Sequence, residues 1–266
     1  MTMTLEFNRQ TLPFETDFQI AGTRCFLSTN SHEVLQAAAR LRKLEKQTSV
    51  PSFEMEVIVD SALDRAPERL AYFRGLKHIV FAIVPPRCFL AYDLLRRRVH
   101  AVLSITAAQD HSFWDTLLLP ITIGLMGTTV GVAPIHSACL ERNGRGFLVA
   151  GVSGAGKSTL TAALAQLGFG LVSDDWTYIS ERQCGLVAYG LSSPVKLLPD
   201  AVRFFPELRA FAPRTTLNGE LAYEIDPVGS TMGFIAKNVS QPRRVFLLER
   251  TASRGCHFVP CRHEYV

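Results

Sequence analysis

The stretch GVSGAGKS, residues 151–158, decides the fold because it matches the pattern G-x-x-x-x-G-K-[ST] at every fixed position. Glycines let the backbone curl around an anion so that several N–H groups point inward. The apolar residues 146–150 precede the stretch, and a run of good helix formers, residues 158–167, follows it. A strand, a loop and a helix are therefore expected, with the positive end of the helix facing a phosphate.

This loop predicts a nucleoside triphosphate bound together with Mg²⁺. Lys157 is expected to reach the β- and γ-phosphates, and the Ser158 hydroxyl is expected to ligate the metal. Ser153 is placed to offer a hydroxyl near the γ-phosphate. The residues expected to contact the nucleotide share the loop and the first helical turn: Gly151, Ser153, Gly154, Ala155, Gly156, Lys157, Ser158 and Thr159.

A pair of acids, Asp174 and Asp175, follows the expected helix and a short strand, residues 171–173. This order returns the chain to the phosphate end of the sheet. Phosphoryl transfer needs a carboxylate for Mg²⁺, and a kinase gains from one that orients or deprotonates the acceptor hydroxyl. Neighbouring side chains of a regular strand face opposite ways, so both acids serve the site only if the strand ends there. The alternative is one functional acid beside one solvated acid.

Strand and turn signals surround this centre. Asn143 and Gly144 separate two apolar runs, residues 135–141 and 146–150, and predict a hairpin. Further strands are expected at residues 177–179, 186–189, 221–225 and 245–249. In the first part of the chain, strands are expected at residues 14–20, 24–28, 54–59, 78–84, 88–92 and 99–105, with a helix at 31–46 capped by Ser31. Short antiparallel strands with one helix predict a small α+β region over residues 1–108, ahead of a catalytic region over 109–266.

Residues 116–135 carry no charge over 20 positions, which is the length of a membrane span. Two prolines and three glycines interrupt the run, and it ends shortly before a loop that works in water. We therefore expect a buried helix running into a strand, within a helix at residues 110–126, and no membrane partner.

The composition is that of an ordinary folded protein, with 47% hydrophobic and 20% charged residues. The net charge of +4 is mild, and no basic stripe indicates a nucleic-acid partner. Six cysteines occur without a C-x-x-C pair, and no secretory signal begins the chain, so a cytoplasmic protein with reduced thiols is expected. Cys256, His257, Cys261 and His263 leave a zinc site open as an alternative, although their spacing is not a common zinc pattern.

His136 and the five residues after it, followed by a hairpin, the loop 151–158 and Leu171-Val172-Ser173-Asp174-Asp175, resemble the catalytic domain of bacterial HPr kinase/phosphorylase. The resemblance covers residues 135–180. The glycine-rich signature of that family is not recognisable in residues 190–199, so the chain is more similar to the divergent HPr-kinase-related group, which includes kinases acting on a lasso-peptide serine. Without this resemblance, His136 would be interpreted as a core or edge residue, as is usual for a lone histidine on an apolar strand.

This resemblance implies an α/β fold with a mixed sheet and a phosphoenolpyruvate-carboxykinase-like core, and an ATP- and Mg²⁺-dependent kinase acting on a protein or peptide serine. It implies Lys157, Asp174, Asp175 and His136 as catalytic residues. One aspartate would act as base, Asp175 being favoured, and the other would hold the metal with Ser158. His136 would tune the base. A homo-oligomer, the reverse phosphorylase reaction and the acceptor's identity stay open.

Four further cationic residues are candidates. Lys196 is expected to face the nucleotide or the acceptor, with a solvated lysine as the alternative. Arg243-Arg244 and Arg250 are candidates to neutralise transition-state charge, with surface arginines as the alternative. Two other functions compete with the serine kinase: a small-molecule kinase on the same core, and a non-catalytic nucleotide-binding module. No guanine-recognition motif Asn-Lys-x-Asp favours a GTPase.

Overall fold

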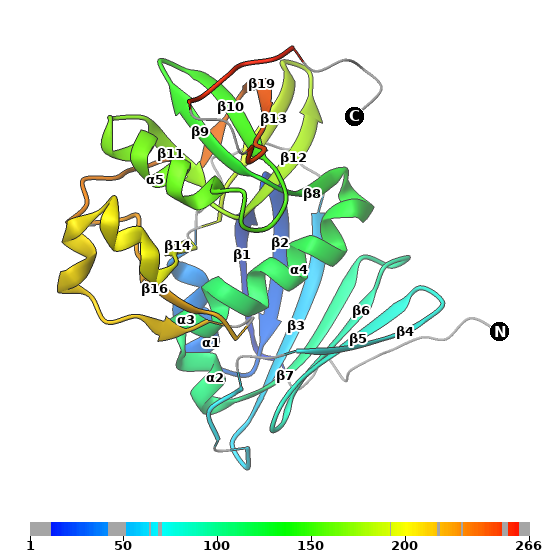
Figure 1. Ribbon diagram of the computed structural model, residues 1–266. Coiled ribbons are helices and arrows are strands. Elements are labelled where there is room, and N and C mark those ends of the chain that lie inside the picture. The colour runs from blue at the N-terminus through cyan, green and yellow to red at the C-terminus, as the bar shows by residue number, and fades with distance from the viewer. Residues whose placement is uncertain are drawn as a thin grey trace.

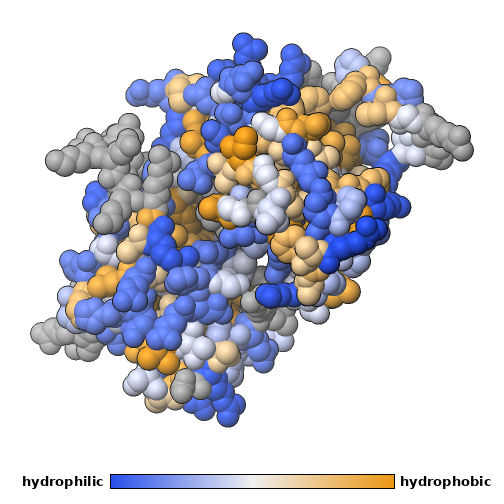
Figure 2. Space-filling view, turned by 90° about the vertical axis from the view of Figure 1, so that its left-hand side faces the viewer, coloured by the Kyte–Doolittle hydropathy of each residue, from blue (hydrophilic) through white to orange (hydrophobic). Residues whose placement is uncertain are grey.

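The computed structural model describes residues 12–41, 52–63, 65–68, 71–191, 193–216, 219–229, 231–251 and 255–260. Over these residues the chain is a mixed α/β protein with four sheets. Figure 1 shows a large twisted sheet below and smaller sheets above it, with helices between and beside them. Hydrophilic and hydrophobic residues are interspersed on the side of the molecule that Figure 2 presents.

The large sheet has the order β1-β2-β3-β7-β6-β5-β4. Its strands are β1 Phe14–Ile20, β2 Thr23–Thr29, β3 Ser52–Asp60, β4 Tyr72–Leu76, β5 Ile79–Val84, β6 Cys88–Asp93 and β7 Arg98–Ser104. Ala21 and Gly22, both with positive φ, close the β1–β2 hairpin. The expectation of an antiparallel sheet is wrong at its centre, because β2, β3 and β7 run parallel.

Helix α1, His32–Ala39, lies between β2 and β3 along the chain and supplies the crossover that parallel strands require. Ser31 caps it, as expected, since its side chain accepts hydrogen bonds from the N–H groups of Glu33 and Val34. The helix ends at Ala39 and not near residue 46. Residues 42–51 lie outside the described part of the chain.

The apolar segment after β7 contains a short helix, α2 Ile105–Gln109, and a longer helix that begins after the extended residue Asp110 and changes its winding. The longer helix consists of α3 His111–Phe113, the π-helical turn η2 Trp114–Leu118, α4 Leu119–Met126 and the 3₁₀ turn η3 Gly127–Val130. Figure 1 shows it crossing one face of the large sheet. Buried side chains from both form one core, among them Trp114, Leu118, Ile123, Met55 and Leu90.

The stretch His111–Val130 is long and apolar enough to cross a membrane, and 56% of its most apolar window is buried inside the protein. The expected buried helix running into a strand is what the structure contains. The division expected at residue 108 falls within α2, whose buried residues share a core with the large sheet and with the longer helix. The domain division itself stays a prediction.

Three smaller sheets follow. A five-stranded sheet has the order β17-β11-β9-β10-β19, a four-stranded sheet β18-β13-β12-β8, and a three-stranded sheet β14-β16-β15. The strands are β8 Val132–His136, β9 Ala138–Arg142, β10 Arg145–Ala150, β11 Gly170–Ser173, β12 Trp176–Arg182, β13 Gly185–Tyr189, β14 Val195–Leu197, β15 Arg214–Thr215, β16 Leu221–Ile225, β17 Ile235–Ala236, β18 Val239–Ser240 and β19 Pro242–Leu247. Helix α5 spans Lys157–Gln166, and the 3₁₀ turns η4 and η5 span Pro199–Arg203 and Pro206–Ala210.

The five-stranded sheet is mixed, as expected. β10 pairs antiparallel with β9 through the predicted Asn143–Gly144 turn, and parallel with β19. The strand expected at residues 135–141 is wrong as a single element, because it divides at Ser137 into β8 and β9. β8 pairs with β12 in one sheet, whereas β9 pairs with β10 and β11 in the other. One chain crossing therefore joins the two sheets beside the acidic pair.

We predict that Trp114→Ala lowers the free energy of unfolding by about 3–5 kcal/mol, because the indole is fully buried and its Nε1 donates to Ala108 O at 3.1 Å. Urea denaturation measures the change. Leu95→Ala is the control, since this leucine is 71% exposed and its truncation is expected to change stability by about 0.5 kcal/mol or less. A loss below about 1 kcal/mol for Trp114→Ala would contradict the packing of this helix in the core.

Candidate active site

The glycine loop, residues Gly151–Gly156, joins the end of β10 to the start of α5, as the sequence predicts. Its backbone depends on glycine at both ends. Gly151 has φ 152°, and a Cβ there would lie 2.6 Å from Leu248 O, which is too close for any side chain. Gly156 has φ 103°, in the region that favours glycine. The loop can therefore turn sharply between the strand and the helix while its middle remains exposed.

Lys157 lies across the inside of this loop. The residue is 8% exposed, and its Nζ donates to Gly151 O at 2.8 Å and to Val152 O at 3.3 Å. Lys157 is also the first residue of α5, so the positive end of the helix opens at the same place as the ammonium group. An exposed loop, a helix N-terminus and a lysine thus converge where an anion would bind.

The other residues predicted to contact the nucleotide differ in their exposure to solvent. Ser153 and Gly154 are exposed at the tip, and Ser158 and Thr159 are half-buried in the first turn of α5. Ala155 is buried, so it can contribute only its backbone groups to a ligand. The structure therefore places all eight predicted nucleotide contacts on one continuous loop and helix end.

Asp174 is the buried member of the acidic pair. It is 6% exposed, and its Oδ2 accepts a hydrogen bond from the backbone N–H of Lys196 at 3.2 Å. Burial raises the pKa of the Asp174 carboxyl to about 7, and the neighbouring charge of Asp175 adds to the rise. The Lys196 N–H and the Ser158 hydroxyl lie close enough to act in the opposite direction on this pKa. The carboxyl of Asp174 and the hydroxyl of Ser158 are thus neighbours.

These two side chains fit a Mg²⁺ ion. The Oδ1 atom of Asp174 is buried and has no hydrogen-bond partner among the residues that the structure describes. A hard cation with oxygen ligands would satisfy that atom, and Ser158 would supply a second oxygen. No cluster of three or more His, Cys, Asp or Glu that could hold a metal occurs in the described ranges. Mg²⁺ is usually held in proteins by one or two carboxylates, with substrate phosphates and water as its other ligands.

Asp175 turns the other way, toward solvent and His136. The His136 Nε2 lies 2.8 Å from Asp175 Oδ1, and the two side chains are 49% and 47% exposed. The imidazole also stacks on the Trp176 ring, with centroids 5.4 Å apart and planes 29° from parallel. The structure therefore brings His136 to Asp175, as the resemblance implies. The roles of the two residues stay predictions.

The two acids can face different ways because β11 ends at Ser173 and β12 begins at Trp176. The Ser173 and Thr177 hydroxyls lie 2.6 Å apart across this bend, and Thr177 Oγ1 lies 2.7 Å from Ser137 O, to which it donates. These contacts fix the bend to the point where β8 and β9 separate. The expected end of the strand at the acidic pair is confirmed.

Strand β14 supplies a contact that the sequence indicated only in part. Lys196 was expected to face the nucleotide or the acceptor; its backbone N–H donates to Asp174, and its charge acts to lower the pKa of that carboxyl. Just after β13, Gly190 lets the chain pack closely on β11, because a Cβ there would lie 1.6 Å from Val172 O. The glycine is the sequence signal for this close packing, but its partner strand could not be identified before the fold was known.

The three candidate arginines do not lie in one place. The Arg250 Nη2 lies 3.9 Å from the position of a Cβ built on Gly156, so this guanidinium reaches the glycine loop. Arg244 pairs with Phe147, near the start of β10, whereas the loop begins beyond Ala150. Arg243 and Arg244 therefore lie at the opposite end of the strand pair and do not belong to this site.

The cysteines do not extend the site. Cys25, Cys88 and Cys139 are buried free thiols, and Cys184 and Cys256 are exposed free thiols. His257 is also exposed. Cys261 and His263, the other members of the alternative zinc site, lie outside the described residues.

Comparison with known proteins adds little to this geometry. No protein-family model and no curated protein matches the chain. Among solved structures, it is similar to the Hpr(Ser) kinase/phosphatase from Coxiella burnetii, at 17% identity and a TM-score of 0.30. The match covers 48% of this chain and 66% of that one, just under two thirds of its length. A similarity of this size does not show family membership, and the phosphoenolpyruvate-carboxykinase-like core stays a prediction.

The raised pKa of Asp174 predicts a pH-dependent stability. An acid with a higher pKa in the folded than in the unfolded state lowers the free energy of unfolding as pH rises from its ordinary pKa, 3.8, to about 7. Asp174→Asn removes this titration. In nucleotide-free protein, we expect its gain in Tm to be at least about 2 °C larger at pH 8 than at pH 5, measured by calorimetry.

Asp200→Asn is the matched control, because Asp200 is an exposed carboxylate whose side chain is 64% accessible. It is expected to shift Tm little at either pH. Equal gains for Asp174→Asn at pH 5 and pH 8 would show that the Asp174 carboxyl does not titrate in this range.

Proposed function

We propose that this protein is an ATP-dependent kinase that phosphorylates a serine hydroxyl on a protein or peptide, as a divergent member of the HPr-kinase-related group. One observation carries the proposal: the buried Asp174 lies beside Ser158, in the first turn of α5 after the glycine loop, while the adjacent Asp175 faces solvent against His136. A group suited to hold a metal and a group suited to take a proton are therefore adjacent residues at one phosphate-binding loop.

In the proposed reaction the serine Oγ forms a bond to the γ-phosphorus, the bond from that phosphorus to the leaving ADP breaks, and the hydroxyl proton passes to the Asp175 carboxylate. His136 holds this carboxylate in place through the 2.8 Å contact. Trp176 supports the imidazole by stacking. Positioning of this kind, together with charge stabilisation, accounts for most of the catalysis in phosphoryl transfer.

Asp174 and Ser158 would hold the Mg²⁺, which supplies charge neutralisation on the phosphates when it is bound. Lys157 and the backbone N–H groups of the glycine loop would bind the phosphate oxygens. Arg250 stands near the same loop and would neutralise charge that develops on the transferred group.

Exposure favours a macromolecular acceptor over a small molecule. Asp175, His136 and Trp176 are each about half exposed, at 47%, 49% and 45%. A small substrate is normally enclosed by its pocket, with most of its surface buried. An open carboxylate beside an aromatic ring suits a chain that lies across the surface. A non-catalytic nucleotide-binding module would gain nothing from the contact between His136 and Asp175.

We predict that Lys157→Ala and Asp175→Asn both abolish transfer from γ-labelled ATP to an arrayed set of serine-containing peptides, for different reasons. Lys157→Ala should weaken binding of a fluorescent ATP analogue, because it removes the ammonium from the phosphate site. Asp175→Asn should bind the analogue normally and lower kcat by about 10²–10⁴-fold, the usual contribution of a general base. Transfer at the wild-type rate by Asp175→Asn would eliminate this residue as the base.

The arginines offer an internal comparison. Arg250→Ala is expected to lower kcat by about 10²-fold, since it removes one cation near the transferring group. Arg243→Ala removes an exposed arginine from the opposite end of the same strand pair and is expected to leave kcat unchanged. Steady-state rates of the two variants under saturating ATP test the assignment, and equal losses would contradict it.

A further inference from the structure

A cavity lies between the large sheet and the five- and four-stranded sheets, apart from the glycine loop. Its volume is about 760 Å³, within the range of ligand-binding cavities. It lies among the β1–β2 turn, the end of α1, the apolar helix and the β17–β18 segment. Its polar lining comes from Gln19, Arg40, Asp115, Glu141, Lys237 and Asn238. Apolar side chains from β1, α4 and β13 complete the walls.

Positively and negatively charged side chains line this cavity in equal number. Two cationic and two anionic side chains line it, and Arg40 Nη1 lies 3.3 Å from Asp115 Oδ2. A neutral lining gives no attraction to a triphosphate or a nucleic acid. The side-chain amides of Gln19 and Asn238 can donate to and accept from peptide groups, and the apolar walls can cover hydrophobic side chains. This mixture suits an extended peptide of mixed composition.

One wall of the cavity faces the candidate active site. Leu191, Ala236, Lys237 and Asn238 line both this cavity and a smaller hollow, and Asp174 lines the smaller one. The wall is held at both edges by backbone hydrogen bonds: Lys237 N–H donates to Leu171 O, and Gly190 N–H donates to Asn238 O. The cavity is therefore separated from the hollow beside Asp174 by a single wall.

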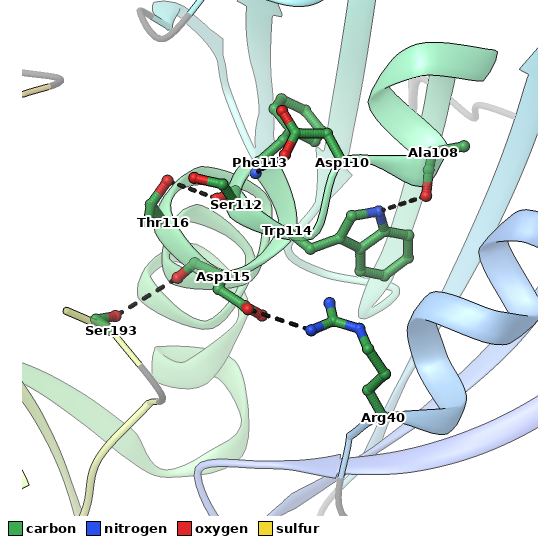
Figure 3. A network of polar contacts seen from close by, with 9 residues as sticks. All are labelled: Arg40, Ala108, Asp110, Ser112, Phe113, Trp114, Asp115, Thr116 and Ser193. Carbon is green, nitrogen blue, oxygen red and sulfur yellow. Dashed lines mark hydrogen bonds and ion pairs between the residues drawn. The ribbon is translucent and has the colours of Figure 1, made fainter. Parts of the chain in front are cut away.

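Polar contacts made by Asp115, in the helix His111–Val130, join the cavity lining to the chain segment that leads to Asp174. Figure 3 shows Arg40 reaching from α1 to the Asp115 carboxylate in the π-helical turn, and Ser193 on the other side of Asp115. The Ser193 Oγ lies 3.5 Å from Asp115 O, to which it donates. Three residues further on, the Lys196 N–H binds Asp174. The loop before β14 thus contacts Asp115 of the cavity lining through Ser193, and β14 itself contacts the buried acid through Lys196.

We infer that this cavity is the docking site for the acceptor peptide, which binds through residues flanking the phosphorylated serine while the serine itself reaches Asp175. The inference rests on the proposed kinase function and adds to it the place where the acceptor is recognised. A small molecule enclosed in the cavity would not reach the exposed Asp175 carboxylate, whereas an extended peptide is long enough to occupy the cavity and place a serine at Asp175.

The test uses an array of twelve-residue peptides, each with one central serine and varied flanking residues. The best peptide found with wild-type protein and γ-labelled ATP becomes the substrate, and its serine-to-alanine form becomes a non-reactive ligand for fluorescence anisotropy. Asn238→Trp fills the cavity from its exposed wall, and Gln19→Trp fills it from β1. Leu95→Trp, at an exposed position in the turn between β6 and β7, is the control.

We expect both cavity variants to raise KM for the peptide and its anisotropy Kd by about tenfold or more, with kcat at saturating peptide, ATP-analogue binding and Tm unchanged. Leu95→Trp should match wild type in every measurement. A photo-cross-linking residue at position 238 should label with the alanine peptide, whereas the same residue at position 95 should not.

Normal KM and Kd in both folded cavity variants, with transfer intact, would overturn the docking inference and leave the kinase proposal standing. Failure of wild-type protein to phosphorylate any peptide would count against the kinase proposal. Probing the same array for binding without nucleotide separates the two results, because cross-linking at position 238 reports occupancy of the cavity without any transfer. Absence of peptide binding there would overturn the docking inference on its own.

Discussion

The site depends on the burial of one carboxyl group, that of Asp174. Folding removes it from water and offers the Lys196 N–H, the nearby Ser158 hydroxyl and the charge of Lys196 in partial return. A buried carboxylate without full compensation is unfavourable, so its proton is retained to a higher pH. The surrounding structure must hold the group there against this cost, which the bend between β11 and β12 achieves through the Ser173 and Thr177 hydroxyls. An uncompensated oxygen at this position is what a cation would stabilise.

Local patterns were sufficient for the centre of this protein. The glycine loop, the Asn143–Gly144 hairpin, the capped start of α1 and the buried helix after β7 were all predicted, because each depends on residues close together in sequence. The contact between His136 and Asp175 followed only from the resemblance to a family, since nothing local in either residue specifies the other. The structure confirms the contact itself, and the catalytic roles of the two residues remain predictions.

Pairings between distant segments could not be predicted. The parallel centre of the large sheet requires the chain to cross over through α1, and strand propensity does not distinguish this from an antiparallel arrangement. The contact of the Lys196 backbone with Asp174, and the packing of Gly190 on Val172 of β11, likewise join segments that are distant in sequence. The separation of Arg250 from Arg243 and Arg244 depends on the direction of β19 beside β10. In each case the sequence does not specify how segments that are distant along the chain pair with one another.

Ser137 has a consequence for how the molecule can move. The chain leaves one sheet and enters another at this residue, and its carbonyl oxygen is held by Thr177 from the far side of the acidic bend. His136 therefore belongs to one sheet, whereas Cys139 and the strand that supports the glycine loop belong to the other. His136 pairs with Trp176, the residue after Asp175, so the histidine and its carboxylate are carried by the same sheet. Sliding of the two sheets would therefore move this pair as a unit relative to the glycine loop, and the chain crossings at Ser137 and at the acidic bend oppose such a shift.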